Sequence, residues 1–170
     1  MRRYIYFVFL LCCAVNLLLT SCVRQKYVVM DMVHHNPGEA MTESKFLDPS
    51  FLKKNEYGAK VFFLFEAAQF GIDWKSFDPS LFPATTEAGR WVAEKAEIIH
   101  KKYDAAKKED LQVYCMLDML VLPSLLVEKH RTELTNEQGK LDISKPYTQL
   151  CIRELMKEMF ETFPQLDGLV

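Results

Sequence analysis

Polar side chains that can bind a ligand occur where three predicted strands end. His34 and His35 follow the first apolar run after residue 25. Glu66 directly follows a second such run, and Asp118 follows a third. Carboxylates exchange hydrogen bonds with hydroxyl groups, and the indole of the nearby Trp74 offers an apolar face for the C–H side of a ring. Residues of these types at successive strand ends predict a substrate-binding site for a hydroxyl-rich ligand.

Each of these residues also has a structural alternative, because polar residues at a strand end often cap the next helix or hydrogen-bond a loop. A metal site is not expected. Neighbouring residues of an extended segment, such as His34 and His35, point to opposite sides. The five cysteines follow neither a zinc spacing nor a disulfide framework. We therefore expect no metal and no cofactor, and both interpretations of the strand-end residues stay open.

Composition limits the class of protein and its partners. The chain has 170 residues, of which 49% are hydrophobic and 26% charged, as in folded globular proteins. Lys and Arg total 21 against 23 Asp and Glu, for a formal net charge of -2. No block of like charge occurs along the chain, whereas proteins that neutralise phosphates concentrate Lys and Arg. We therefore expect no nucleic-acid partner.

The first 22 residues have the pattern of a bacterial lipoprotein signal. Two arginines precede an apolar run over residues 4–19, and residues 19–22 (Leu-Thr-Ser-Cys) resemble a lipobox. We expect residues 1–21 to be removed, Cys22 to be lipidated, and residues 22–25 to form a short tether. The alternative is an uncleaved membrane helix, which needs about 20 apolar residues. The sequence thus predicts a membrane-anchored cell-envelope lipoprotein, with the outer membrane favoured.

Strands and helices alternate over residues 26–170. Apolar runs without alternation are typical of parallel strands that are covered on both faces. The expected strands cover residues 26–33, 60–65, 111–117 and 166–170, and the expected helices cover 49–57, 87–106 and 145–163. Gly58 is expected to end the first helix, and Ser144 to cap the last. A period near 3.6 predicts that Trp91, Val92 and Tyr103 lie on the buried face of the second helix, and Met156 and Phe160 on that of the third. Two further cysteines, Cys115 and Cys151, are expected to be buried apolar fillers, although a bridge between them stays open.

This order of elements predicts an α/β fold, a partial (β/α)8 TIM barrel with three βα units and the start of a fourth strand. Long segments at 67–86 and 119–144 follow strands, and such loops surround the site in barrel enzymes. Because residue 170 falls inside a predicted strand, we expect residues 26–170 to be the amino-terminal half of a truncated barrel domain. The alternative is a small doubly wound α/β domain. That fold usually has a Gly-rich turn after its first strand, and residues 34–38 lack this spacing.

Four segments carry a resemblance to a known superfamily. They are DMVHHNPGE (31–39), AKVFFLFEAAQFGIDW (59–74), VYCMLDMLVLP (113–123) and FPQLDGLV (163–170). They resemble the amino-terminal part of secreted, often lipid-anchored bacterial proteins of the TIM-barrel glycoside hydrolase superfamily. The resemblance implies a glycoside hydrolase-like lipoprotein that acts on poly- or oligosaccharide outside the cytoplasm.

What the resemblance transfers to this chain is substrate contact rather than catalysis. It implies that His34, His35, Glu66 and Asp118 line sugar subsites. In retaining barrel glycosidases the two catalytic carboxylates follow the fourth and seventh strands, so no catalytic residue can be assigned here. Whether the parent protein is an enzyme stays open, and the 170-residue chain alone is expected to be inactive. The alternative is a non-catalytic carbohydrate-binding or scaffold lipoprotein on the same barrel.

Overall fold

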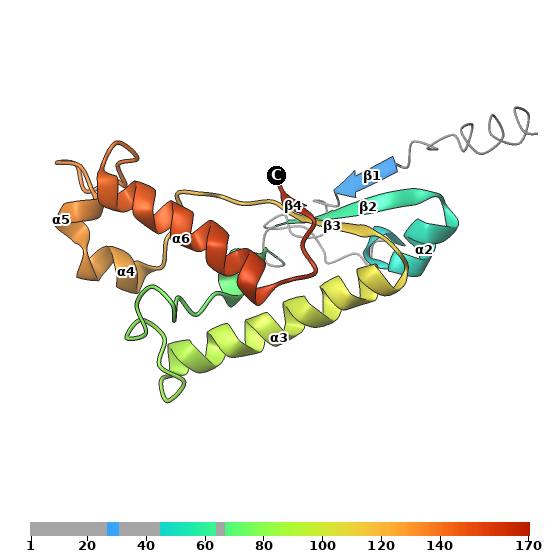
Figure 1. The fold of residues 1–170 in the computed structure, drawn as a ribbon, viewed down its shortest axis with the longest axis horizontal. Coiled ribbons are helices and arrows are strands. Elements are labelled where there is room, and N and C mark those ends of the chain that lie inside the picture. Colours follow the sequence, from blue (N-terminus) through green and yellow to red (C-terminus); the bar gives the residue numbers. More distant parts are fainter. Residues whose placement is uncertain (1–26, 31–44, 64–66) are drawn as a thin grey trace, which may run out of the picture.

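The protein is an α/β structure built on a parallel sheet (Figure 1). The computed structural model describes residues 27–30, 45–63 and 67–170. Its strands are β1 (Tyr27–Met30), β2 (Tyr57–Phe62), β3 (Gln112–Cys115) and β4 (Gly168–Leu169). They lie in the order β1-β2-β3-β4, and every neighbouring pair is parallel. Four residues of interest, His34, His35, Glu66 and Cys22, lie outside the described residues.

Helices connect the successive strands. The α-helices are α2 (Pro49–Lys54), α3 (Glu87–Lys108), α4 (Ser124–Lys129), α5 (Arg131–Leu134) and α6 (Pro146–Thr162), and the short 3-10 helices are η2 (Lys45–Leu47) and η4 (Ala68–Gly71). Helix α3 begins where the hydroxyl of Thr86 accepts a hydrogen bond of 3.0 Å from the amide of Gly89. The two long helices predicted from the sequence are confirmed, and so is the strand between them.

Two expected helix ends are wrong. Helix α2 stops at Lys54, and Gly58 lies inside β2 instead of ending the helix. The chain turns at Glu56, whose φ is +65°, and Gly58 is the extra residue where the β1–β2 register shifts. Ser144 does not cap α6, because its hydroxyl donates to Asp142 Oδ1 at 2.7 Å.

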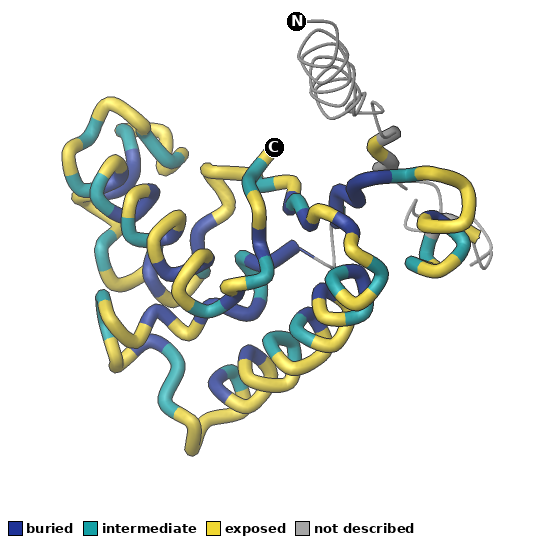
Figure 2. The backbone as a smooth tube through the Cα atoms, turned by 45° about the vertical axis from the view of Figure 1, so that its right-hand side comes forward, coloured by how far each residue is buried: buried dark blue, intermediate teal, exposed yellow. Residues whose placement is uncertain are grey.

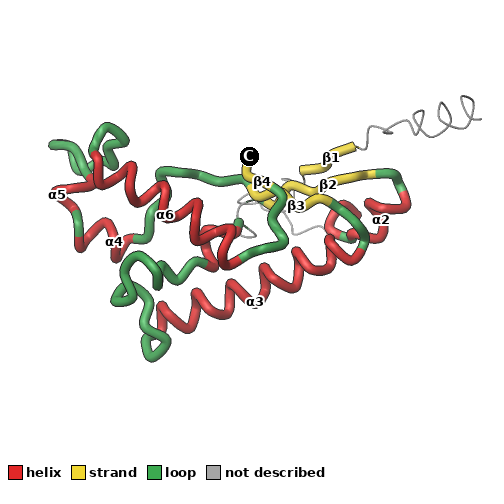
Figure 3. The backbone as a smooth tube through the Cα atoms, in the orientation of Figure 1, coloured by secondary structure: helices red, strands yellow, loops and turns green. Residues whose placement is uncertain are grey.

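Helix α3 packs against the sheet, whereas α6 packs against η4 and α5 beyond the carboxyl ends of the strands (Figure 3). The ring of Phe62 in β2 lies 4.7 Å from that of Tyr103 in α3, and Phe163 after α6 lies 5.6 Å from the same tyrosine. Side chains alternate along a strand, so Val28 and Tyr114 point to the opposite face. Val28 is 60% exposed and Tyr114 half-buried. In the described part of the chain the opposite face is therefore partly open.

The hydrophobic core lies between the sheet and these helices. Buried positions recur along α3 and α6, between exposed ones (Figure 2). Cys115 and Cys151 are buried and unbridged, as expected of apolar fillers. The thiol of Cys115 accepts a hydrogen bond from the amide of Ala68 at 3.2 Å, and burial raises the pKa of that thiol. This bond holds η4 against β3.

The expected apolar stripes of the long helices are buried only in part. On α3, Val92 and Tyr103 are buried, whereas Trp91 is exposed. On α6, Met156 and Phe160 are also exposed. No described helix combines the length and apolar character that crossing a bilayer requires.

Candidate functional site

A cavity opens at the carboxyl ends of β2 and β3. It has a volume of about 220 Å³, and we call it the strand-edge cavity. Its walls include Phe63, Gln69, Phe70, Met116, Asp118 and Val121. The carboxyl edge of a parallel sheet is where α/β proteins commonly bind ligands. Of the five residues expected to bind substrate, only Asp118 and Trp74 belong to the described residues, and Asp118 lines this cavity.

The polar end of the strand-edge cavity is formed by Gln69 and Asp118. The amide of Asp118 donates to Gln69 Oε1 at 3.3 Å, and Asp118 Oδ1 accepts from the amide of Leu120 at 3.1 Å. Within the described part of the chain, Gln69 Nε2 and Asp118 Oδ2 make no hydrogen bond. One donor and one acceptor are therefore left for a ligand.

A larger apolar groove adjoins the strand-edge cavity. Its volume is about 410 Å³, and Gln69, Phe70 and Val121 line both spaces. Helix α3 forms one wall, helix α4 forms another, and the segment after η4 forms the floor. The lining is mainly aliphatic and aromatic, with the hydroxyl of Ser124 at the start of α4. Both spaces are thus mainly apolar, and the polar side chains of Gln69 and Asp118 lie at the sheet edge.

The two tryptophans of the chain occupy different levels of this groove. Trp74 is only 1% exposed and packs its ring edge-on against Phe77, with centroids 6.0 Å apart. A ring with this little accessible surface fills the core rather than offering a face to a sugar. Trp91 stands at the rim, 48% exposed, and Lys95 Nζ lies 5.7 Å from its ring centroid.

The helical period predicted that Trp91 is buried, and it did not reveal that this ring lies exposed at the rim of the groove. The available signal was in the segment after β3, where residues 119–121 (Met-Leu-Val) are apolar within a predicted loop. All three are exposed, and Val121 lines the groove. Apolar residues without alternation in a loop indicated a surface that the helix pattern alone did not reveal.

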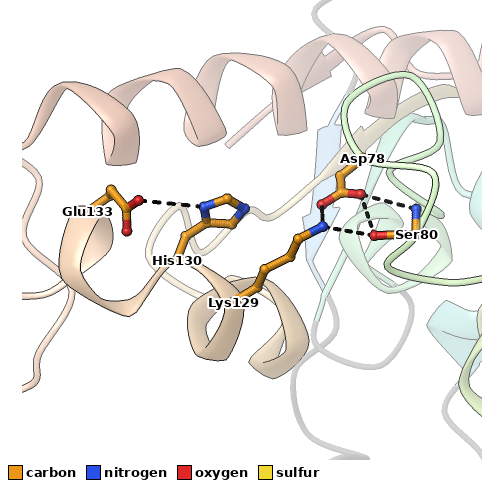
Figure 4. Close-up of polar contacts among 5 residues, drawn as sticks. All are labelled: Asp78, Ser80, Lys129, His130 and Glu133. Atoms are coloured by element: carbon orange, nitrogen blue, oxygen red, sulfur yellow. Dashed lines mark hydrogen bonds and ion pairs between the residues drawn. The ribbon is translucent and has the colours of Figure 1, made fainter.

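A polar cluster that we call the loop clamp joins the segment after η4 to helix α4 (Figure 4). It consists of Asp78 and Ser80, after η4, and Lys129 of α4. Lys129 Nζ donates to Asp78 Oδ2 at 2.6 Å and to Ser80 Oγ at 2.8 Å. The amide and hydroxyl of Ser80 both donate to Asp78 Oδ1. These bonds, that from Lys129 foremost, lower the pKa of Asp78 to about 2.

Two further groups next to the clamp are also engaged within the protein. The ring of His130 lies 4.7 Å from that of Tyr147, and its Nδ1 is 4.0 Å from Glu133 Oε1 (Figure 4). Glu158 of α6 is 3% exposed and accepts a hydrogen bond from the amide of Phe77 at 3.2 Å. Burial raises the pKa of the Glu158 carboxyl. These side chains fix the loops that surround the groove.

The chemistry that these residues support is ligand binding. Among the described residues, Asp118 is the one carboxylate that lines the strand-edge cavity or the groove. Glycoside hydrolysis commonly needs two carboxyl groups that flank the bond. The described residues also contain no cluster of three His, Cys, Asp or Glu suited to a metal ion.

Comparison of the chain with protein-family models, with curated proteins and with solved structures finds no match. Any functional assignment therefore depends on the chain's own residues and geometry.

Proposed function

We propose that this chain is the sugar-binding, amino-terminal part of a TIM barrel in a lipid-anchored, glycoside hydrolase-like protein that acts on poly- or oligosaccharide. The observation that carries the proposal is the strand-edge cavity, lined by Gln69 and Asp118, whose Nε2 donor and Oδ2 acceptor make no hydrogen bond with the described residues. Sugar hydroxyls both donate and accept, so such a pair suits them.

The arrangement of the sheet supports the barrel. Successive strands of a TIM barrel are neighbours, all parallel, with the helices on the outer face only. The described strands follow this order without reversal, and α3 packs on one face, where its Tyr103 contacts Phe62 of β2. A doubly wound sheet would reverse its strand order and carry helices on both faces. The cavity also lies at the carboxyl edge, where barrel enzymes bind substrate.

The proposal gives the described residues a binding role rather than a catalytic one. Among the described residues, Asp118 is the one carboxylate that lines the strand-edge cavity, whereas glycoside hydrolysis needs an acid together with a nucleophile or base. A non-catalytic carbohydrate-binding lipoprotein on the same barrel is the second candidate, and the polar groups of Gln69 and Asp118, which suit binding without cleavage, are the observation that favours it. If the parent protein cleaves the glycan that it binds, the hydrolase-like candidate is supported. If it only retains the glycan, the binding protein is supported.

The lipid anchor belongs to the same proposal. Cys22 precedes β1 by only a few residues, and β1 begins at the amino edge of the sheet, opposite the cavity. An anchor at Cys22 would therefore direct the strand-edge cavity away from the envelope membrane. Cys22→Ala should move the chain from the membrane fraction to the soluble fraction. Unchanged membrane association of this variant would contradict the anchor.

Binding to glycans tests the sugar-binding role. The full chain, held in lipid nanodiscs, should retain one class among a panel of poly- and oligosaccharides, measured by calorimetry. Asp118→Asn and Gln69→Leu should each weaken binding about tenfold, the loss expected for one hydrogen bond to a charged or well-placed polar group. Glu137→Gln, in an exposed turn away from the cavity, is the control and should bind normally. The proposal would be contradicted if no glycan of the panel bound the chain, or if all variants bound glycan with equal affinity.

A further inference from the structure

We propose that the apolar groove binds the apolar part of an amphipathic small molecule whose polar head lies in the strand-edge cavity, such as an alkyl or aryl glycoside. The identity of the head as a sugar rests on the proposed function. The apolar part of the inference rests on the groove alone.

The groove has the form of a small-molecule site. Its volume of about 410 Å³ falls within the range of roughly 300–1,000 Å³ that ligand pockets occupy. Its floor is core, since Ile72 and Trp74 are each 1% exposed. Its rim is accessible, with Trp91 48%, Val121 46% and Leu125 40% exposed. A space with a buried floor and accessible apolar walls from three segments can enclose a ligand on several sides.

The polarity of the two joined spaces defines the ligand. Gln69, Phe70 and Val121 line both the groove and the strand-edge cavity, so one molecule can occupy both. The polar groups left open lie at the end that Asp118 lines, and the walls beyond it are apolar. A ligand that is polar throughout would lose hydrogen bonds to water along the groove. A molecule with a polar head and an apolar body matches both parts.

A second large space shows why the groove is the better candidate. The cavity between α3 and the end of α6 has a volume of about 500 Å³ and includes Glu97 and Asp104 in its lining. Asp73 and Lys101 also line it. Among the described residues, no charged side chain lines the groove, so the groove offers the uncharged apolar walls that the second space lacks.

The protein carries its own reporter for this site. The chain contains two tryptophans, and both line the groove. An apolar group that enters the groove displaces water from the exposed ring of Trp91. Tryptophan fluorescence should then shift to shorter wavelength without any added label.

The experiment compares ligands that share a head and differ in the apolar body. Methyl and hexyl β-glucoside, with 1-hexanol as the headless probe, are titrated into the full chain in lipid nanodiscs, with empty nanodiscs as the blank. Each fully buried methylene should tighten binding by up to about fourfold. Because the rim is open, we expect hexyl glucoside to bind at least about tenfold more tightly than methyl glucoside, with a blue-shifted emission.

Two variants of α3 provide a matched pair. Ala88→Phe places a ring in the groove and should abolish the advantage of the hexyl chain. Ala93→Phe places the same ring on the same helix but in the other cavity, and should leave that advantage unchanged. Leu125→Ser, at the exposed rim, should reduce the advantage without an added ring, which keeps the test valid if Ala88→Phe fails to fold.

The outcomes separate this inference from the proposed function. Equal affinity for methyl and hexyl glucoside would overturn the groove inference and leave the sugar site standing. Binding of 1-hexanol and hexyl glucoside with no contribution from the sugar would support the groove and contradict the sugar site. An unchanged tryptophan emission with hexyl glucoside and 1-hexanol would overturn the inference.

Discussion

The loop clamp and the strand-edge cavity use their polar groups in opposite ways. In the clamp, both carboxylate oxygens of Asp78 accept hydrogen bonds, from Lys129 and from Ser80. At the strand edge, Asp118 Oδ1 accepts one bond, and Oδ2 accepts none from the described residues. Polar groups whose hydrogen bonds are all made within the protein hold loops in place. Polar groups at a cavity that lack a protein partner can hydrogen-bond a ligand.

The contrast extends to the apolar residues of the groove. Trp74 belongs to the clamp loop, since its carbonyl accepts the amide of Asp78 at 2.7 Å, and it is buried. Trp91 stands on the other wall and is half exposed. The loop that contains Trp74 and Asp78 therefore provides the floor of the groove, and the exposed side chain of Trp91 belongs to its rim. The predictions below are changes in the free energy of unfolding that test this division.

The largest expected effect separates the two tryptophans. Trp74→Ala should lower the free energy of unfolding by about 3–5 kcal/mol, the usual cost of emptying a buried aromatic site. Trp91→Ala should cost about 1 kcal/mol or less, because much of its ring is already in water. Urea denaturation followed by circular dichroism measures both. Equal losses would show that the groove is closed core, and the division would fail.

The next effect isolates the contribution of the clamp lysine. Asp78→Asn should lower the free energy of unfolding by about 1–2 kcal/mol, since it removes a charge-assisted bond to the half-exposed Lys129. Asp142→Asn is the matched control. The carboxylate of Asp142 accepts the same two bonds from a serine two residues on, but within the described residues no lysine side chain donates to that carboxylate. The excess loss at Asp78 reports the bond to Lys129, and equal losses would contradict the clamp.

The pH dependence gives a second measure of the same bond. The native pKa of Asp78, about 2, is below its ordinary value of 3.8. A lowered native pKa means that the ionised form stabilises the fold above pH 3.8. This contribution should be lost as the pH falls from about 4 towards 2. Asp78→Asn should therefore be less stable than the wild type at pH 6, and the difference should shrink at pH 2–3.

A smaller effect of opposite sign is expected at Glu158. Burial raises the pKa of this carboxyl, and the nearby charges of Asp73 and Glu161 raise it further. Stability from its protonated form is present below the ordinary value of 4.5 and is lost as the pH rises through the raised native pKa. Glu158→Gln keeps an acceptor for the amide of Phe77 and should raise the melting temperature at pH 8. The gain should shrink towards pH 4.5, and a loss at pH 8 would contradict the cost of the buried charge.

The elements that the sequence predicted best are those with local signals. Helix α3 combines a capping threonine with a long apolar period, and α6 has a proline in its first turn. The end of α2 was wrong because Gly58 serves a bulge between β1 and β2, which depends on pairing with a distant strand. The fold class is shown as α/β with a parallel sheet, whereas the barrel stays a proposal.

The site was harder to predict because its character depends on partners far away in the chain. The pattern Asp-x-Ser occurs at residues 48–50, 78–80 and 142–144, and in each the serine donates to the aspartate. No neighbouring residue in the sequence distinguishes Asp78 as the aspartate that binds a lysine 51 residues away. Periodicity likewise cannot distinguish a tryptophan that faces the core from one that faces a groove.

The smallest expected change in stability is at Asp118, and it decides how the strand-edge residues are interpreted. Its side chain is exposed, and the one bond that it accepts from the described residues, from the amide of Leu120, can be kept by an asparagine oxygen. Asp118→Asn should therefore change the free energy of unfolding by no more than about 0.5 kcal/mol. Denaturation of this variant beside Asp78→Asn measures the contrast directly. A loss as large as that of Asp78→Asn would give Asp118 the structural role of a loop-holding carboxylate. A negligible loss of unfolding free energy together with weakened glycan binding would show that the Asp118 carboxylate serves the ligand.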